Sequence, residues 1–165
     1  MKQLRYLTCA FALLFLGSQL AAQVRAGAGF TYGTKFEKPG LFARGEFQIP
    51  NKDFGIVASA NYYFPKEDKN LGVSQNRMAL NLDGMYTFAG NDFLDIYGLG
   101  GLNVLLASTK ISGFDEKTST TKFGFGVGGG IRYKLESNLI PMAEMRYVNG
   151  GQDEFVINIG VLFGF

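Results

Sequence analysis

Hydrophobic residues alternate with small or polar residues along most of the chain after residue 23. Residues 122–135 give the clearest example. Aromatic or aliphatic side chains occupy nearly every odd position there, and glycine or a cation occupies every even position. Because side chains of a β-strand point alternately to its two faces, this pattern predicts a strand with one apolar face and one glycine-rich, cationic face.

We expect eight strands of this kind. They span roughly 24–34, 41–49, 54–64, 75–88, 93–107, 121–135, 139–148 and 154–165. The connections after the second, fourth and sixth strands are short and rich in turn-forming residues. Those at 35–40, 65–74, 108–120 and 149–153 are mostly longer and polar. No segment beyond Gln23 has sustained helical periodicity or 18 consecutive apolar residues, which excludes a helical membrane protein.

Such a chain predicts an all-β fold, an eight-stranded antiparallel up-and-down barrel with its apolar face either inside or outside. Residue size separates these two arrangements, because the interior of an eight-stranded barrel is only just wide enough to be filled by side chains. The set predicted to face inward contains Gly27, Gly29, Gly33, Gly55, Gly101, Gly124, Gly126, Gly128, Gly130, Gly160 and Gly164. The opposite set contains Phe30, Tyr32, Phe47, Phe54, Tyr62, Phe64, Tyr86, Phe88, Phe123, Phe125, Tyr133, Tyr147, Phe155, Phe163 and Phe165. Because so many rings would overfill the interior, we predict a transmembrane barrel with the rings facing lipid.

The first 22 residues are typical of a secretory signal peptide. Lys2 and Arg5 precede an apolar run at 7–16, and small and polar residues follow it up to Ala22. The apolar run is too short to cross a bilayer, which needs about 20 residues. We therefore predict a signal peptide at 1–22 and a barrel domain at 23–165. Leu20, at the −3 position of a cut after Ala22, departs from the usual Ala-x-Ala pattern, so the cleavage site could shift by one residue.

Composition excludes several kinds of chemistry. The chain has no histidine and one cysteine, which excludes a Ser-His-Asp triad, a histidine metal site and an intrachain disulfide framework. A formal net charge of +2 gives no reason to expect a nucleic-acid partner. Residues 124–129 match the dinucleotide-binding glycine pattern, but the match falls inside a predicted strand, so we expect no cofactor. We also expect no bound metal and no catalytic residues.

Charged residues at inward positions are the remaining candidates for a functional site. They are Arg25, Arg44, Glu46, Arg77, Asp83, Asp95, Lys122, Arg132, Lys134, Glu144 and Arg146. Because buried charges must be paired, we predict a ladder of ion pairs and hydrogen bonds that plugs the barrel. The alternative is a narrow polar passage or a small-molecule site.

The end of the chain carries a further pattern. Apolar residues alternate up to the C-terminal position at Ile157, Ile159, Val161, Phe163 and Phe165. With this ending, residues 24–165 resemble the small eight-stranded outer-membrane β-barrels of Gram-negative bacteria, such as the OmpA membrane domain and the OmpX- and OmpW-type proteins. The resemblance implies that the terminal residues are the signal read by the barrel-insertion machinery. It also implies that both chain ends and the short turns lie in the periplasm, with the longer loops outside the cell.

The resemblance implies an integral protein of the bacterial outer membrane that reaches it by export through the periplasm. We expect a non-enzymatic protein with a structural or surface-interaction role, since the barrel enzymes of this kind rely on histidine. The expected partners are outer-membrane lipid, the insertion machinery, and a surface or envelope protein that contacts the loops. The alternative function is an OmpW-like conduit for small or hydrophobic solutes, and a part in a secretion or assembly complex stays open.

Overall fold

In the computed structural model, the described part of the chain forms eight β-strands. The structure describes residues 24–50, 52–68, 73–111, 117–135, 138–150 and 153–164, so the predicted signal peptide and Phe165 lie outside the described residues. The strands are β1 (Val24–Gly33), β2 (Lys38–Gln48), β3 (Phe54–Asp68), β4 (Val73–Gly90), β5 (Leu94–Ile111), β6 (Lys117–Tyr133), β7 (Leu139–Asn149) and β8 (Glu154–Gly164). Among the described residues, no helix is long and apolar enough to cross a bilayer.

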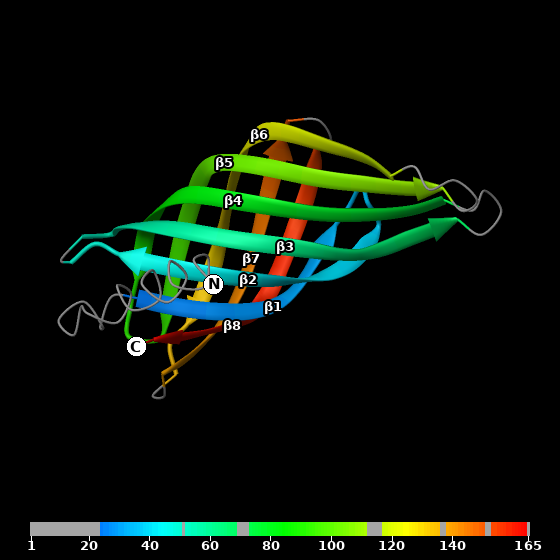
Figure 1. Cartoon of the computed structure of the whole chain (residues 1–165). Coiled ribbons are helices and arrows are strands. Elements are labelled where there is room, and N and C mark those ends of the chain that lie inside the picture. Colours follow the sequence, from blue (N-terminus) through cyan, green and yellow to red (C-terminus); the bar gives the residue numbers. More distant parts are fainter. Residues whose placement is uncertain are drawn as a thin grey trace, which may run out of the picture.

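The strands form one closed antiparallel barrel in chain order (Figure 1). Each strand pairs with the next, and β1 closes the barrel by pairing with β8, for example at Phe30 and Ile159. Closure matters for a barrel in lipid, because an unpaired backbone group costs several kcal/mol in hydrocarbon. The prediction of an eight-stranded up-and-down barrel is confirmed.

The two ends of the barrel differ. The ends of the described chain, Val24 and Gly164, lie at the same end, which we call the proximal end, together with the β2–β3, β4–β5 and β6–β7 connections (Figure 1). The other four connections lie at the opposite end, which we call the distal end. An even number of up-and-down strands requires this arrangement.

The faces of the strands follow the predicted alternation. Every described ring of the aromatic set is exposed, apart from Phe47 and Tyr147, which are partly exposed. All eleven glycines of the small set are buried or partly buried. Exposure is largest at Phe123, with 76%, and at Phe88 and Phe125, with 70% each. Such a broad exposed apolar band is typical of a surface in contact with lipid.

The predicted loops at 65–74 and 108–120 are wrong for most of their length. Strand β3 continues to Asp68, β4 begins at Val73, β5 continues to Ile111 and β6 begins at Lys117. These segments form a four-stranded extension beyond the rest of the barrel (Figure 1), which we call the distal sheet and define as residues 64–68, 73–76, 107–111 and 117–124. Sequence pattern missed it because most of its residues are polar on both faces, so no apolar alternation marks the strands.

Candidate functional site

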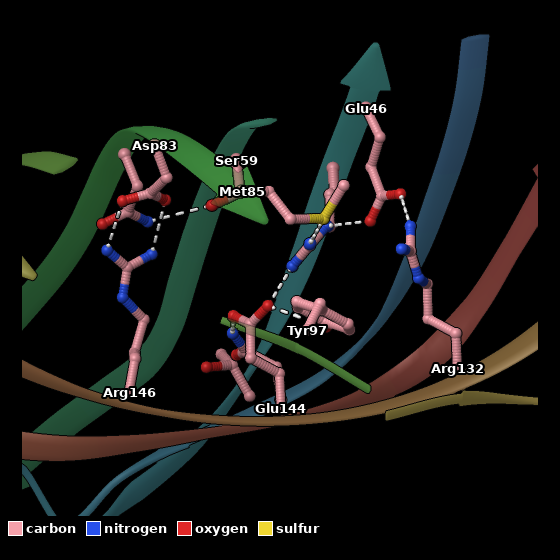
Figure 2. A network of polar contacts seen from close by, with 12 residues as sticks. Glu46, Ser59, Asp83, Met85, Tyr97, Arg132, Glu144 and Arg146 are labelled. Carbon is pink, nitrogen blue, oxygen red and sulfur yellow. Dashed lines mark hydrogen bonds and ion pairs between the residues drawn. The ribbon is translucent and has the colours of Figure 1, made fainter. Parts of the chain in front are cut away.

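The barrel interior holds a cluster of charges in its proximal half, with Glu144 of β7 near its centre (Figure 2). Arg44 of β2 pairs with Glu144 and also donates from Nε to Oε1 of Glu46 over 2.7 Å. The hydroxyl of Tyr97 on β5 donates to Glu144 over 3.0 Å, and the Arg44 guanidinium lies 5.5 Å from the centre of the Tyr97 ring. Tyr97 therefore joins two charged groups that come from strands on different sides of the barrel.

The same cluster extends toward the proximal mouth. Arg132 of β6 donates to Glu46 over 2.6 Å and lies 3.8 Å from Asp95. Lys134 pairs with Asp95 at 2.7 Å, and Arg25 lies 3.7 Å from Glu46. The side chains of Lys134 and Arg25 are partly exposed at the mouth, whereas Arg132 and Glu46 are almost fully buried.

A separate ion pair joins β4 to β7. The two terminal nitrogens of Arg146 donate to the two carboxylate oxygens of Asp83, each over 3.0 Å, as Figure 2 shows. Paired parallel hydrogen bonds of this kind fix both distance and orientation. Both side chains are almost completely buried.

A neutral layer of asparagines lies distal to the charged cluster. The amide of Asn61 donates to Thr31 and to Asn158 over 2.9 and 3.0 Å, and Asn81 donates to Asn61 over 3.1 Å. Asn103 donates to Asn81 over 2.6 Å, and Asn158 connects the layer to Glu144 over 3.2 Å. The pattern of charged inward residues in the sequence did not indicate this layer, because its members are uncharged.

The distal end of the interior is closed by Arg77 of β4 and Glu154 of β8, which form an ion pair. The Arg77 guanidinium lies 5.4 Å from the ring centres of both Phe36 and Tyr63. Phe36 comes from the β1–β2 connection, where the next residue, Glu37, has a positive φ of 56°. This turn buries the Phe36 ring in a cluster with Tyr63 and Leu105.

The interior pairs connect strands that are not neighbours. Arg132–Glu46 and Arg77–Glu154 each join strands four apart in the eight-stranded barrel, and Arg146–Asp83 joins strands three apart, so these side chains meet across the lumen. Between the asparagine layer and Arg77 lies a cavity of about 10 Å³. A cavity of this size holds about one water molecule.

Two wider spaces lie toward the mouths of the barrel. The distal cavity measures about 160 Å³, and Lys122 lines it together with Gln75, Arg77 and Thr120. The proximal cavity measures about 420 Å³ and is lined by Asp53, Asp92, Asp95 and Lys134, among other residues. Within the part of the chain that the structure describes, no group of three or more His, Cys, Asp or Glu is placed to hold a metal.

The predicted site residues therefore fall into three places. Arg44, Glu46, Arg77, Asp83, Asp95, Arg132, Glu144 and Arg146 are buried in the interior, whereas Arg25 and Lys134 lie at the proximal mouth and Lys122 at the distal mouth. They do not form one continuous ladder, because the neutral asparagine layer separates Arg77 from the proximal cluster. Glu154, the partner of Arg77, was missed, although it shares the inward phase of Val156 and Asn158 on β8.

The predicted terminal signal lies on the lipid-facing side of β8. Ile157, Ile159 and Phe163 are exposed and Val161 is partly exposed, while Phe165 lies outside the described residues. Together, the closed antiparallel barrel, the exposed aromatic band and the paired polar interior define an integral membrane β-barrel protein.

The comparison with family models agrees. The model of the outer membrane protein beta-barrel domain matches residues 7–165, and the chain belongs to this family. Members of this family are proteins of the bacterial outer membrane. A search of curated protein sequences finds no significant match.

Solved structures with the same fold include three bacterial barrels. The N-terminal barrel domain of Pseudomonas aeruginosa OprF has a TM-score of 0.70 and 18% identity, over 87% of this chain and 98% of that chain. Ail, the attachment invasion locus protein of Yersinia pestis, has a TM-score of 0.64 and 15% identity, and the match covers 87% of this chain and 99% of that chain. Neisserial surface protein A has a TM-score of 0.63 and 20% identity, and the match covers 86% of this chain and 96% of that chain. At these identities the likeness shows the shared fold.

Proposed function

We propose that this protein is a non-enzymatic outer-membrane barrel with a closed interior, and that its role is structural or lies in contacts made at the cell surface. The observation that carries the closed interior is the set of ion pairs that meet across the lumen, above all Arg146–Asp83 and Arg132–Glu46. Charges that are hydrogen-bonded to each other in this way occupy the space that ions or solutes would need.

Planar-bilayer recording tests the closed interior. Protein folded into detergent and added to the bilayer is expected to give no conductance steps above those of the bare bilayer. A water-filled porin measured in the same bilayers is the positive control. Reproducible unitary steps from the folded protein would overturn the closed interior and favour the transport alternative, a narrow conduit for small or hydrophobic solutes.

A surface role depends on the orientation of the barrel. We propose that residues 1–22 direct export, that the proximal end faces the periplasm and that the distal sheet projects outside the cell. The proposed mature chain has no cysteine, since the single Cys9 lies in the predicted signal peptide. A cysteine at Thr118, which is exposed in the distal sheet, should therefore react on intact cells with a maleimide too large to pass porins.

The matched control places the cysteine at Asp92, which is exposed in the proximal β4–β5 connection. This variant should react only after the outer membrane is permeabilised. The opposite labelling pattern would reverse the proposed orientation.

We further propose that outer-membrane lipid surrounds the aromatic band and that the insertion machinery reads the end of the chain. Supporting this, the described members of the terminal pattern lie on one outward face of β8. Deletion of Phe165 should lower the amount of folded barrel in the outer membrane, measured by heat-modifiable migration on gels. Replacement of Phe165 by Tyr, which keeps an aromatic end, is the control.

A further inference from the structure

The lipid-facing side of the barrel has a hollow over β4 and β5. Gly84, Gly98 and Gly100 alternate with inward residues such as Asp83 and Leu99, so these three glycines face outward. Gly84 pairs with Gly100 across the two strands. The hollow measures about 400 Å³, and we call it the glycine hollow. It is lined by the three glycines and by Phe54, Tyr86, Phe88 and Val127, among other residues.

Rings cover only part of the glycine floor. A Cβ built on Gly84 would meet the ring of Phe54, and one built on Gly98 would fall on the ring of Phe88. A ring that lies over a glycine in a sheet replaces the missing side-chain contacts. Gly100 has no such cover, because the nearest atom to a Cβ built there is a backbone oxygen at 3.6 Å. The floor therefore stays open at Gly100.

The wall of the hollow on its proximal side is formed by Tyr86 and Phe88. The β4–β5 register shifts between Thr87 and Ala89, as at a β-bulge, and Phe88 lies at this shift. Bulges change the direction in which a side chain points. The rings of Tyr86 and Phe88 meet edge to face, with their centres 5.2 Å apart.

The same two rings also line the proximal cavity, so the glycine hollow and the proximal cavity adjoin each other. The hollow is apolar, whereas the proximal cavity is polar. Three aspartates and one lysine line it, namely Asp53, Asp92, Asp95 and Lys134.

The charges of the proximal cavity do not balance. Lys134 pairs with Asp95 at 2.7 Å. Asp53 and Asp92 are exposed, and within the described ranges their carboxylates form no ion pair. The apolar hollow thus ends beside two carboxylates that attract a cation.

The glycine hollow itself accepts hydrocarbon. Its floor offers no polar group, because β5 is paired with β4 and with β6 on either side of Gly100. Ile96 and Leu102, outward on the same strand, are exposed in the apolar band, so the hollow opens to lipid. An apolar cavity of about 150 Å³ can bind benzene, so the larger hollow has room for a segment of hydrocarbon chain.

We propose that the glycine hollow binds one acyl chain of a membrane lipid whose headgroup carries a protonated amine, and that this amine lies beside Asp53 and Asp92. The inference rests on the proposed contact between the aromatic band and lipid, and it names the class of lipid. An ammonium donates charge-assisted hydrogen bonds to carboxylates, which are stronger than hydrogen bonds between neutral groups. The lipid belongs to the leaflet nearer the proximal end.

A second copy of the chain is a poorer occupant. Two copies in one membrane have the same orientation, so a dimer formed through the hollow would bring their exposed aspartates together at the same depth. Like charges at short distance repel each other. A lipid with an anionic headgroup is disfavoured for the same reason.

The chain contains no tryptophan, so a single introduced tryptophan reports on one place. Phe54→Trp puts it on the wall of the hollow, and Phe30→Trp, at an exposed position of β1, is the matched control. Each folded variant, in nonionic detergent micelles, is titrated with phosphatidylethanolamine that has brominated acyl chains, since bromine quenches tryptophan fluorescence. We expect saturable quenching at position 54, and at position 30 quenching that only follows the lipid content of the micelle.

Brominated phosphatidylglycerol has the same chains and no amine. It should bind at the Phe54→Trp position about ten-fold more weakly, the effect of losing one charge-assisted hydrogen bond. Asp53→Asn combined with Asp92→Asn should abolish this preference. Asp153→Asn, at an exposed aspartate of the distal end, is the matched control and should keep it.

Gly100→Leu, added to Phe54→Trp, fills the hollow and should remove saturable quenching by both lipids. Ala58→Leu, at an exposed outward position of β3, is its control and should leave the quenching unchanged. Heat-modifiable migration on gels confirms that each variant still forms the barrel.

Three results would overturn the proposal: equal affinity for the two lipids at position 54, indistinguishable quenching at positions 54 and 30, or saturable quenching that persists in Gly100→Leu. A dimer in light scattering that Gly100→Leu separates would also overturn it, because a second copy would then fill the hollow. If the barrel folds, does not conduct and is quenched alike at both positions, this inference fails while the lipid-facing band and the closed interior stand.

Discussion

At the scale of single residues, Arg146 and Asp83 show what a narrow barrel requires of a buried charge. Each is almost fully buried, and each makes two hydrogen bonds to the other across the lumen. The attraction between buried charges roughly offsets the cost of removing them from water, so such a pair adds little net stability. Removal of only one of the two charged side chains, however, leaves the other charge buried in the interior without a partner.

We therefore expect Asp83→Ala to lower the free energy of unfolding by about 3–5 kcal/mol, because Arg146 would remain buried without its partner. Urea unfolding of the barrel in lipid vesicles, followed by the far-UV circular dichroism of the β-sheet, measures this change. The double variant Asp83→Leu with Arg146→Met removes both charges and should stay within about 1–2 kcal/mol of the unaltered protein. Equal losses in the single and double variants would contradict the pairing.

Gly126 shows why glycine faces inward beside this pair. A Cβ built on Gly126 would fall on the guanidinium of Arg146. We expect Gly126→Ala to displace that guanidinium from Asp83 and to cost about 1–3 kcal/mol, measured in the same unfolding experiment. Gly45 has no heavy atom within 4 Å of a built Cβ, so Gly45→Ala should change stability by less than about 0.5 kcal/mol. Similar costs at both positions would mean that glycine content, and not space around Arg146, sets the effect.

The residues that the sequence did not reveal share a cause. Tyr97 is in phase with Asp95, which we predicted to face inward. Because Tyr97 carries no charge, the sequence did not indicate that its hydroxyl contacts the buried charges. Asn61 and Asn81 carry no charge, so a search for ion pairs passed over them. Alternation predicts which face a side chain occupies, but it does not predict which residues meet across the lumen, because that depends on the stagger of the closed sheet.

At the scale of one element, β8 combines a lipid-facing row with an interior row. Ile159 is the middle member of the outward row and is 59% exposed, whereas Asn158 beside it is 3% exposed and hydrogen-bonded inside. The two neighbours therefore experience hydrocarbon and a polar interior, respectively.

Ile159→Arg should lower the free energy of unfolding in vesicles by about 2–4 kcal/mol, since a cation near the bilayer midplane is costly. Phe163→Arg, at the last described outward position of β8, is the matched control and should cost only about 0–1 kcal/mol near the interface. A larger loss at Phe163 than at Ile159 would contradict the placement of the apolar band along β8.

Strand boundaries were predictable only where lipid or the interior imposes a pattern. The eight predicted runs match the eight strands, because each crosses the aromatic band with one apolar face. In the distal sheet, β4 and β5 continue as strands through Ser74, Gln75, Ser108 and Thr109, with polar residues on both faces. Backbone hydrogen bonds between neighbouring strands hold these segments. Such bonds do not depend on side-chain hydropathy, so the hydropathy pattern does not predict them.

At the scale of the whole molecule, closure and the exposed aromatic band act together. The closed ladder pairs the backbone of every strand within the band, while rings such as Phe30 and Phe123 are left exposed. Water would be a poor solvent for this surface, because contiguous apolar patches of large area drive association.

We accordingly expect residues 23–165, refolded from urea, to form a monomer with strong β-sheet circular dichroism in detergent or lipid. In buffer without any amphiphile the same chain should aggregate. Gel migration before and after boiling, together with light scattering, measures both outcomes. A compact monomer that persists in plain buffer would contradict the lipid-facing assignment of the rings.

The placement of the strand ends has a practical consequence for engineering. Because Val24 and Gly164 lie together at the proximal end, domains fused to either terminus would emerge on the same side of the membrane. Guest sequences inserted between β3 and β4 or between β5 and β6 would instead emerge on the other side, raised above the lipid by the distal sheet. With the orientation proposed above, this small barrel would serve as a scaffold for displaying peptides on living bacteria.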